Sequence, residues 1–153
     1  MKDMIAELLQ NRVLIAAVTA WVVGQFLKIP LEYILNKRLN WGIIFSAGGL
    51  PSSHSASVTA VALTIGFREG FRTSIFALAT AIAMIVIYDA AGVRRQAGIH
   101  AERINEIMKN FIESRRFPEE DLKEMLGHTP FEVIAGVLLG VLISWLLFIT
   151  FPV

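Results

Sequence analysis

Long apolar runs constrain this chain more than any other feature of its sequence. Four stand out, at about 13–27, 55–67, 71–88 and 131–153, and the last two carry one charged residue each. A helix that spans a bilayer needs about 20 predominantly apolar residues, with a range of about 17 to 25. The last two runs qualify outright. The first, interrupted by Lys28 and Pro30, qualifies if its ends snorkel, and the second qualifies if residues 49–54 also lie at membrane depth.

These runs predict an all-α fold, a polytopic membrane helix bundle of about four transmembrane helices formed by residues 1–153 as a single domain. Hydrophobic residues make up 55% of the chain and charged residues only 18%, which is more apolar than an ordinary soluble domain. The sequence has no cysteine, which excludes disulfide and thiolate chemistry. Residues 1–12 carry charges of both signs, and we expect no cleavable signal peptide.

The long polar stretch 91–128 contains one further periodic pattern. Apolar residues recur there at helical spacing, at Ile104, Ile107, Met108, Phe111 and Ile112. This spacing predicts an amphipathic helix, either packed on the bundle or lying at the membrane surface.

Four spans would put the polar stretches 36–48 and 91–128 on one side of the membrane and both termini on the other. The side that holds the two stretches carries ten of the 14 cationic residues. Because positive charge in short loops stays cytoplasmic, we predict that this side faces the cytosol from the cell (inner) membrane.

The same side receives the reactive side chains of the chain, although they come from three separate places in the sequence. Ionisable groups at membrane depth are costly and usually mark a site. The group consists of Ser52, Ser53, His54, Arg94, Arg95, His128 and Glu132.

Each of these residues also has a structural explanation. Ser52 or Ser53 could cap a helix, and Thr129 with Glu132 has the form of a capping box. Arg94 and Arg95 could anchor the end of the third span, with Asp89 as the partner of one of them, and the GxxxG of Gly136 and Gly140 favours close helix packing. Neither capping nor packing requires the imidazoles of His54 and His128.

The motifs of common soluble enzymes are missing, since the chain has no HExxH, Walker-type glycine loop or GxSxG. A metal site built from His54, His128, Glu132 and Asp89 is conceivable. The neighbouring arginines favour an anion such as phosphate instead, because cations repel a metal ion. We therefore expect no metal and no cofactor.

Three motifs, "GGLPSSHSAS", "YDAAGVRRQAG" and "GHTPFEVIAGVLLG", resemble in this order the divergent branch of the type 2 phosphatidic acid phosphatase and vanadium-dependent haloperoxidase superfamily. The branch consists of small bacterial and chloroplast membrane proteins, and the resemblance covers essentially the whole chain. The superfamily motif Pro-Ser-Gly-His corresponds to residues 51–54, with Ser53 in place of Gly. Its last motif corresponds to His128, Glu132, Val133 and Gly136, with Glu in place of the usual Asp.

Two departures from the superfamily pattern affect the cations. Leu122 stands where an Arg normally precedes the His of the last motif, so Arg94 or Arg95 would have to supply that guanidinium. The first motif, a Lys followed by Arg-Pro, is reduced to Lys28 with Lys37 and Arg38 further on.

The resemblance implies metal-independent hydrolysis of a phosphomonoester by an acid-phosphatase-like enzyme. His128 would attack phosphorus and form a phosphohistidine, Glu132 would hold its other ring nitrogen, and His54 would act as general acid and base. Phosphate binding is assigned to Ser52, Ser53, Arg94, Arg95, Lys28 and Arg38, with Asp89 beside the arginines.

The expected substrate is a lipid phosphate, because such a site opens at a membrane surface and the helices can hold acyl or isoprenyl chains. Phosphatidylglycerophosphate and phosphatidate fit a cytosolic site, and undecaprenyl pyrophosphate fits the opposite face. The alternative is a non-catalytic scaffold or an anion- and lipid-binding protein that retains the phosphate site. The expected partners are the substrate and membrane lipids, with no nucleic acid, and the small number of helices is compatible with a homodimer.

Overall fold

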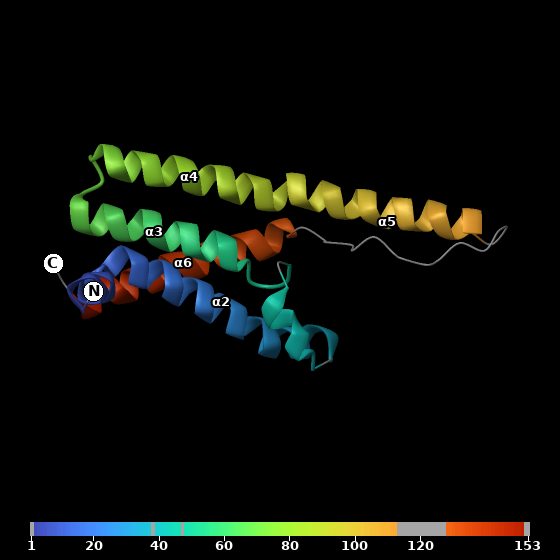
Figure 1. The fold of residues 1–153 in the computed structure, drawn as a ribbon, viewed down its shortest axis with the longest axis horizontal. Helices are drawn as coiled ribbons and strands as arrows, with labels where there is room; N and C mark the ends of the chain where they lie inside the picture. Colours follow the sequence, from blue (N-terminus) through green and yellow to red (C-terminus); the bar gives the residue numbers. More distant parts are fainter. Residues whose placement is uncertain (1, 38, 47, 113–127, 152–153) are drawn as a thin grey trace.

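The computed structural model describes residues 2–37, 39–46, 48–112 and 128–151, and these residues form an all-helical bundle. Helices α2, α3, α4 and α6 lie side by side along the long axis and alternate in direction (Figure 1). The predicted all-α fold is therefore confirmed. The elements in chain order are α1 (Lys2–Gln10), α2 (Arg12–Asn36), the 3-10 helix η1 (Trp41–Phe45), α3 (Ser53–Glu69), α4 (Ser74–Ala91), α5 (Val93–Ile112) and α6 (Pro130–Thr150).

Three of the described helices, α2, α4 and α6, are long and apolar enough to cross a membrane. Their outer faces expose large apolar side chains such as Phe26, Ile85 and Leu138, which suits contact with lipid. The fourth predicted span corresponds to α3, which has 17 residues and begins with the polar sequence Ser53-His54-Ser55. It packs against α2, α4 and α6. The count of four transmembrane helices therefore stays a prediction.

Helix α2 is longer than the first apolar run. It continues through Lys28 and Pro30 to Asn36, where Lys37 adopts the left-handed conformation and ends the helix. Lys28 does not interrupt the helix because its side chain is directed into the protein, where it is completely buried. The missing amide hydrogen of Pro30 does not end the helix either, as is common in spanning helices.

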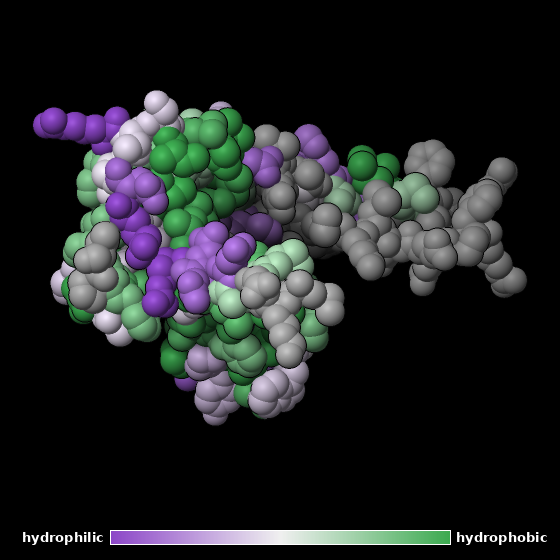
Figure 2. Space-filling view, turned by 60° about the vertical axis from the view of Figure 1, so that its left-hand side comes forward, coloured by the Kyte–Doolittle hydropathy of each residue, from purple (hydrophilic) through white to green (hydrophobic). Residues whose placement is uncertain are grey.

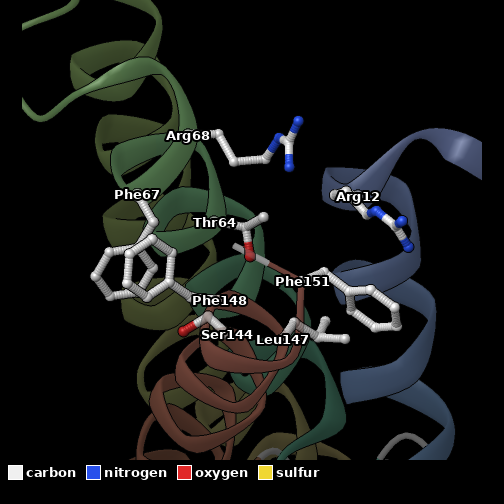
Figure 3. Close-up of a pocket in the computed structure, with 8 residues that line it drawn as sticks. All are labelled: Arg12, Thr64, Phe67, Arg68, Ser144, Leu147, Phe148 and Phe151. Atoms are coloured by element: carbon white, nitrogen blue, oxygen red, sulfur yellow. The ribbon is translucent and has the colours of Figure 1, made fainter. Parts of the chain in front are cut away.

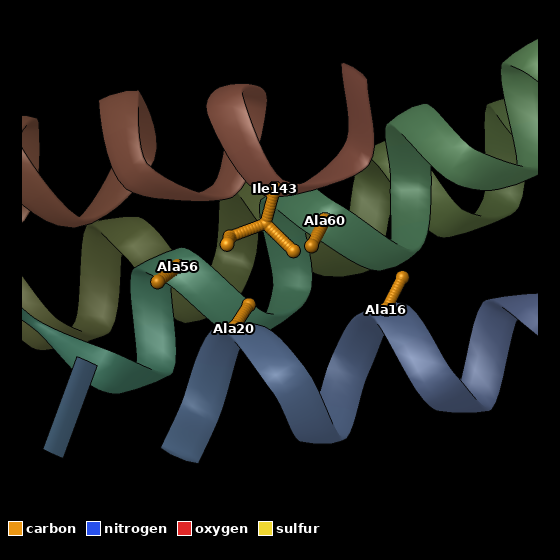
Figure 4. Packing of buried hydrophobic residues seen from close by; sticks show 5 residues of the cluster. All are labelled: Ala16, Ala20, Ala56, Ala60 and Ile143. Carbon is orange, nitrogen blue, oxygen red and sulfur yellow. The ribbon is translucent and has the colours of Figure 1, made fainter. Parts of the chain in front are cut away.

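Small residues bring α2, α3 and α6 close together. The core contains Ala16 and Ala20 of α2, Ala56 and Ala60 of α3, and Ile143 of α6, whose side chains meet between the three helices (Figure 4). A methyl group added at Gly136 would meet the carbonyl oxygen of Ser52, and one added at Gly140 would meet that of Ala56. The predicted close packing through the GxxxG motif is therefore confirmed.

The capping predictions are also confirmed. The Ser52 hydroxyl accepts a hydrogen bond from the Ser55 amide at 3.3 Å and caps α3. Thr129 and Glu132 form a complete capping box at the start of α6. These caps fix the starts of α3 and α6, which lie at the same end of the bundle (Figure 1).

Helix α5 confirms the amphipathic helix. It does not pack along the bundle, which was one of its two predicted placements, and the other, at the membrane surface, stays a prediction. After a break at Gly92 it continues from α4 in nearly the same direction and extends away from the bundle (Figure 1). Among the described elements it contacts only α4, and Ile104, Ile107 and Met108 are exposed. Because the break is a single residue, α5 keeps the direction of α4 instead of folding back onto the bundle.

Helix α1 was not predicted. It ends before Asn11, whose side chain caps α2 by accepting from the Leu14 amide at 3.0 Å. Its exposed apolar residues are Met4, Ile5, Leu8 and Leu9. This spacing is the sequence signal that could have revealed α1, and an apolar stripe on a short charged helix suits the membrane interface.

Candidate active site

The candidate site forms where α2 passes the starts of α3 and α6. Helix α2 contributes Lys28, the first turn of α3 contributes Ser53 and His54, and the start of α6 contributes Glu132, with His128 just before it. Sequence reasoning predicted that residues from distant positions converge at one end of the bundle, and the described residues of the site do so.

His128 and Glu132 form the best-defined pair of the site. The Nδ1 atom of His128 lies 3.3 Å from Oε2 of Glu132, and the His128 side chain is only 3% exposed. A carboxylate that accepts from Nδ1–H leaves the lone pair of the imidazole on Nε2. That Nε2 atom is buried and has no hydrogen-bond partner among the described residues.

Glu132 has two roles, which the sequence presented as alternatives. The oxygen that faces His128 also accepts a hydrogen bond from the Thr129 amide at 2.9 Å. In return, the Thr129 hydroxyl accepts from the Glu132 amide at 3.3 Å. The cap therefore fixes the carboxylate that orients the imidazole.

His54 lies next to His128. The centroids of the two imidazole rings are 6.3 Å apart and their planes are inclined by 60°, so the rings are neighbours without being stacked. His54 is half-buried on the first turn of α3. The two side chains can therefore act on one bound group, His54 from α3 and His128 from the residues before α6.

Lys28 supplies a buried positive charge. Its side chain has no exposed surface, and its Nζ atom donates a hydrogen bond to the Ser46 carbonyl oxygen at 2.7 Å. The ammonium group and the Glu132 carboxylate attract one another across the site. Gly49, with φ of +98°, brings the backbone close to the Lys28 stem, at a position where a Cβ atom would lie 3.7 Å from Cδ.

The two serines of the Pro51–His54 turn differ in what their hydroxyl groups contact. The Ser52 hydroxyl accepts from the amide and the hydroxyl of Ser55, and the Ser52 amide donates to the Glu132 carbonyl at 2.9 Å. The Ser53 hydroxyl is buried and has no partner among the described residues. Ser52 is thus used by the fold, whereas Ser53 has a hydroxyl to offer a ligand.

The predicted arginines are not located by the structure. Arg38 and Leu122 lie outside the described residues. The backbones of Arg94 and Arg95 belong to α5, but their side chains are outside the described part of the chain. Asp89 is half-buried in the last turn of α4, at the end of the bundle where α3 and α6 begin (Figure 1). The guanidinium expected from Arg94 or Arg95 stays a prediction.

Sequence reasoning missed two contributors to the site. Ser46 acts through its backbone carbonyl, and a backbone acceptor has no sequence signal. Gly24 lets α3 approach α2, since a Cβ atom there would lie 3.2 Å from Cα of Ser53. A glycine inside an apolar helix is the only signal that could have pointed to this contact.

Comparisons with known proteins support the motif-based resemblance. Residues 9–143 match the divergent PAP2 family. The chain is also 39% identical over 152 residues to YuiD of Bacillus subtilis strain 168, which is described as an uncharacterized membrane protein. That match covers 92% of this chain and 96% of YuiD. No solved structure matches the chain.

The site and the comparisons together define a PAP2-like membrane protein. The chain belongs to the divergent PAP2 family. The predicted resemblance is confirmed, and the three apolar helices with the membrane-protein relative support a membrane location.

Proposed function

We propose that the protein is a lipid phosphate phosphatase that hydrolyses phosphomonoesters through a phosphohistidine, without a metal ion. The observation that carries this proposal is the Nε2 atom of His128. It is buried and unpartnered among the described residues, while Nδ1 of the same ring faces Glu132. An imidazole held in this way keeps the lone pair of Nε2 free of other hydrogen bonds, so that it can attack the phosphorus of a bound ligand.

In the first step, Nε2 of His128 attacks phosphorus and the bond from phosphorus to the ester oxygen breaks. The protonated His54 gives its proton to the leaving alkoxide, which departs as an alcohol. Glu132 stabilises the positive charge that develops on the His128 ring. The distance of 3.3 Å between Nδ1 and Oε2 supports this role.

In the second step, the neutral His54 takes a proton from water, and the resulting hydroxide attacks phosphorus. The bond between phosphorus and Nε2 breaks, which releases inorganic phosphate and restores both histidines. The neighbouring positions of the two rings support the use of one imidazole in both steps.

Lys28 and Ser53 are proposed to bind the phosphoryl oxygens. A buried ammonium group is held in place by Ser46, so little reorganisation is needed when negative charge builds up on phosphorus. The unpartnered Ser53 hydroxyl can donate to one of the same oxygens. Arg94 and Arg95 remain the proposed source of a guanidinium.

A lipid phosphate is the proposed substrate because the site lies at the end of helices with lipid-suited outer faces. If this end faces the cytosol, phosphatidylglycerophosphate or phosphatidate is the substrate. If the candidate site faces the cytosol, the C-terminus lies outside the cell membrane. A topology reporter fused after Val153 tests this orientation. A reporter that is active in the cytosol would reverse the proposed orientation and favour undecaprenyl pyrophosphate as the substrate.

A non-catalytic lipid- or anion-binding scaffold is the second candidate. It is favoured by Leu122, which stands where the superfamily has the Arg before its last His. A scaffold would bind phosphate at Lys28 and Ser53 without turning it over.

The deciding experiment measures phosphate release by the purified protein from phosphatidylglycerophosphate, phosphatidate and undecaprenyl pyrophosphate. His128→Ala should abolish turnover and keep the fold, and His54→Ala should reduce it about 10²–10⁴-fold, most strongly for poor leaving groups. His100→Ala is the control, because His100 is exposed on α5. Activity should survive EDTA and be blocked by vanadate. Phosphate binding without turnover of any of these lipids would establish the scaffold instead.

A further inference from the structure

A pocket with both polar and aromatic lining residues lies at the end of the bundle opposite the candidate active site. It is formed by the start of α2 and the ends of α3 and α6, and Figure 3 shows its lining. The polar residues of the lining are Arg12, Arg68, Thr64 and Ser144, and aromatic rings including Phe148 and Phe151 complete it.

Two guanidinium groups from different helices border this pocket. Arg12 lies over the Phe151 ring, with Cζ 4.2 Å from the ring centroid, and Arg68 extends from α3 toward the start of α2 in Figure 3. Neither arginine forms an ion pair with another described residue. Two like charges beside one pocket repel each other, and an anion between them would turn that repulsion into attraction.

Thr64, one of the lining residues, carries a buried hydroxyl group. Thr64 is only 5% exposed, and its Oγ1 atom has no hydrogen-bond partner among the described residues. Its neighbour Ser144 is 1% exposed and donates to the Val141 carbonyl at 2.9 Å. A buried hydroxyl without a partner is costly, and Thr64 is the one among the described unpartnered hydroxyls that lines this pocket, where a ligand can accept its hydrogen bond.

The surroundings of the pocket are those of a membrane interface. Figure 2 shows hydrophilic residues gathered at this end of the molecule, with hydrophobic surface next to them. Phe151 and Phe71 are 43% and 53% exposed there, and the exposed apolar residues of α1 belong to the same end. A lipid bound here would place its acyl chains along apolar helix faces and its phosphate between the arginines.

We propose that this pocket binds the phosphate of an anionic phospholipid in the leaflet opposite the candidate active site. Arg12 and Arg68 neutralise the phosphate, and Thr64 donates a hydrogen bond to it. The site shares no residue with the proposed catalytic machinery. The lipid-binding proposal can therefore be tested separately from the proposed phosphatase activity.

Quenching of tryptophan fluorescence by brominated lipids can locate the binding. Trp145 follows Ser144 on α6 and is 53% exposed, so a Trp21→Phe, Trp41→Phe protein reports on the pocket end. A Trp21→Phe, Trp145→Phe protein reports through Trp41 on the other end. Each is reconstituted in vesicles containing brominated phosphatidylglycerol or brominated phosphatidylcholine, and the relative affinity for the anionic lipid is determined.

Trp145 should report a preference for phosphatidylglycerol that falls about fivefold or more in Arg12→Gln and in Arg68→Gln. Thr64→Val should lower the preference for phosphatidylglycerol less than the two arginine substitutions do. Arg72→Gln is the matched control, because Arg72 follows α3 at the same end without lining the pocket. The Trp41 signal should be unchanged by all these substitutions. If Arg12→Gln does not fold, the lipid preference of Arg68→Gln decides the test, because Arg68 is exposed.

Three results would overturn the proposal. The first is an unchanged preference at Trp145 in Arg68→Gln, and the second is an equal loss in Arg72→Gln, which would indicate general surface attraction. The third is binding of inorganic phosphate that is weakened in Arg68→Gln, without any preference for phosphatidylglycerol at Trp145, which would make free phosphate the ligand.

Discussion

The two ends of the bundle hold their cations in different ways. At the candidate active site, Lys28 is completely buried and tied to the Ser46 carbonyl, with Glu132 across the site. At the opposite end, Arg68 is exposed and the half-buried Arg12 lies over an aromatic ring. The first cation has one fixed position, and the other two can adjust to a ligand.

This difference indicates different uses of positive charge. A cation fixed in a site with little water acts strongly on charge that develops in a transition state. Cations near water are screened, and each contributes modestly to holding an anion. Substitutions should therefore affect chemistry at one end and lipid preference at the other.

Among substitutions that leave both histidines in place, Lys28→Met should have the largest effect on hydrolysis. It removes the buried charge while keeping a side chain of similar length, and we expect kcat/KM for lipid phosphate to fall about 10²–10³-fold. Thermal unfolding of the variant is measured alongside, so that a loss of stability from leaving Glu132 without this cation is separated from the loss of turnover. Lys37→Met is the control, since Lys37 is exposed at the same end of α2. If kcat/KM falls equally in Lys28→Met and Lys37→Met, the burial of the Lys28 charge is not the reason for its effect on hydrolysis.

Glu132→Gln separates the two roles of this side chain. The amide keeps an oxygen that can accept from the Thr129 amide, but it loses the charge that stabilises the His128 imidazolium. Activity should fall about 10²-fold, the lower end of what a positioned acid–base group contributes. Thr129→Ala should do the reverse, costing about 1 kcal/mol of stability and little activity. If Glu132→Gln keeps full activity, Glu132 serves only as a helix cap.

Gly136→Ala should destabilise the contact between α3 and α6. The added methyl group would meet the Ser52 carbonyl oxygen, which belongs to backbone and cannot rotate away. We expect a loss of about 1–3 kcal/mol in the free energy of unfolding, as for other overpacked sites. Chemical unfolding in detergent measures it, with Leu138→Ala on the exposed face of α6 as the control.

Arg68→Gln should have the smallest effect on hydrolysis. Because Arg68 lies at the opposite end from His54 and His128, kcat and KM should stay within about twofold of the unsubstituted protein. A loss comparable with that of Lys28→Met, measured in the same phosphate-release assay, would contradict the separation of the two ends.

The helices were predictable to the extent that hydropathy determines them. Runs of apolar residues predicted α4 and α6 because a bilayer requires such runs, and helical spacing predicted α5. The extension of α2 through Lys28 and Pro30 was not predicted, since nothing in the sequence shows that a lysine is buried. The placement of α5 depends on the geometry at Gly92, which the sequence pattern does not specify.

The pairing of His54 with His128 was predictable from alternating helices, because each residue follows a polar loop and begins an apolar helix. The different roles of Ser52 and Ser53 were not. Adjacent serines look alike in a sequence, and only the backbone path before α3 decides which hydroxyl caps the helix. The double role of Glu132 was hidden for the same reason, since one oxygen serves both contacts.

The joint between α3 and α6 has a consequence for how the protein is made. Ser52 and Glu132 are 80 positions apart in the sequence, yet the Ser52 amide bonds to the Glu132 carbonyl. During synthesis, Lys28 enters the membrane well before Glu132 has been translated. Until α6 docks, the nascent chain carries an uncompensated ammonium group at membrane depth, a costly state. The docking of α6 therefore brings the opposite charge of Glu132 to Lys28 and completes the site in one event.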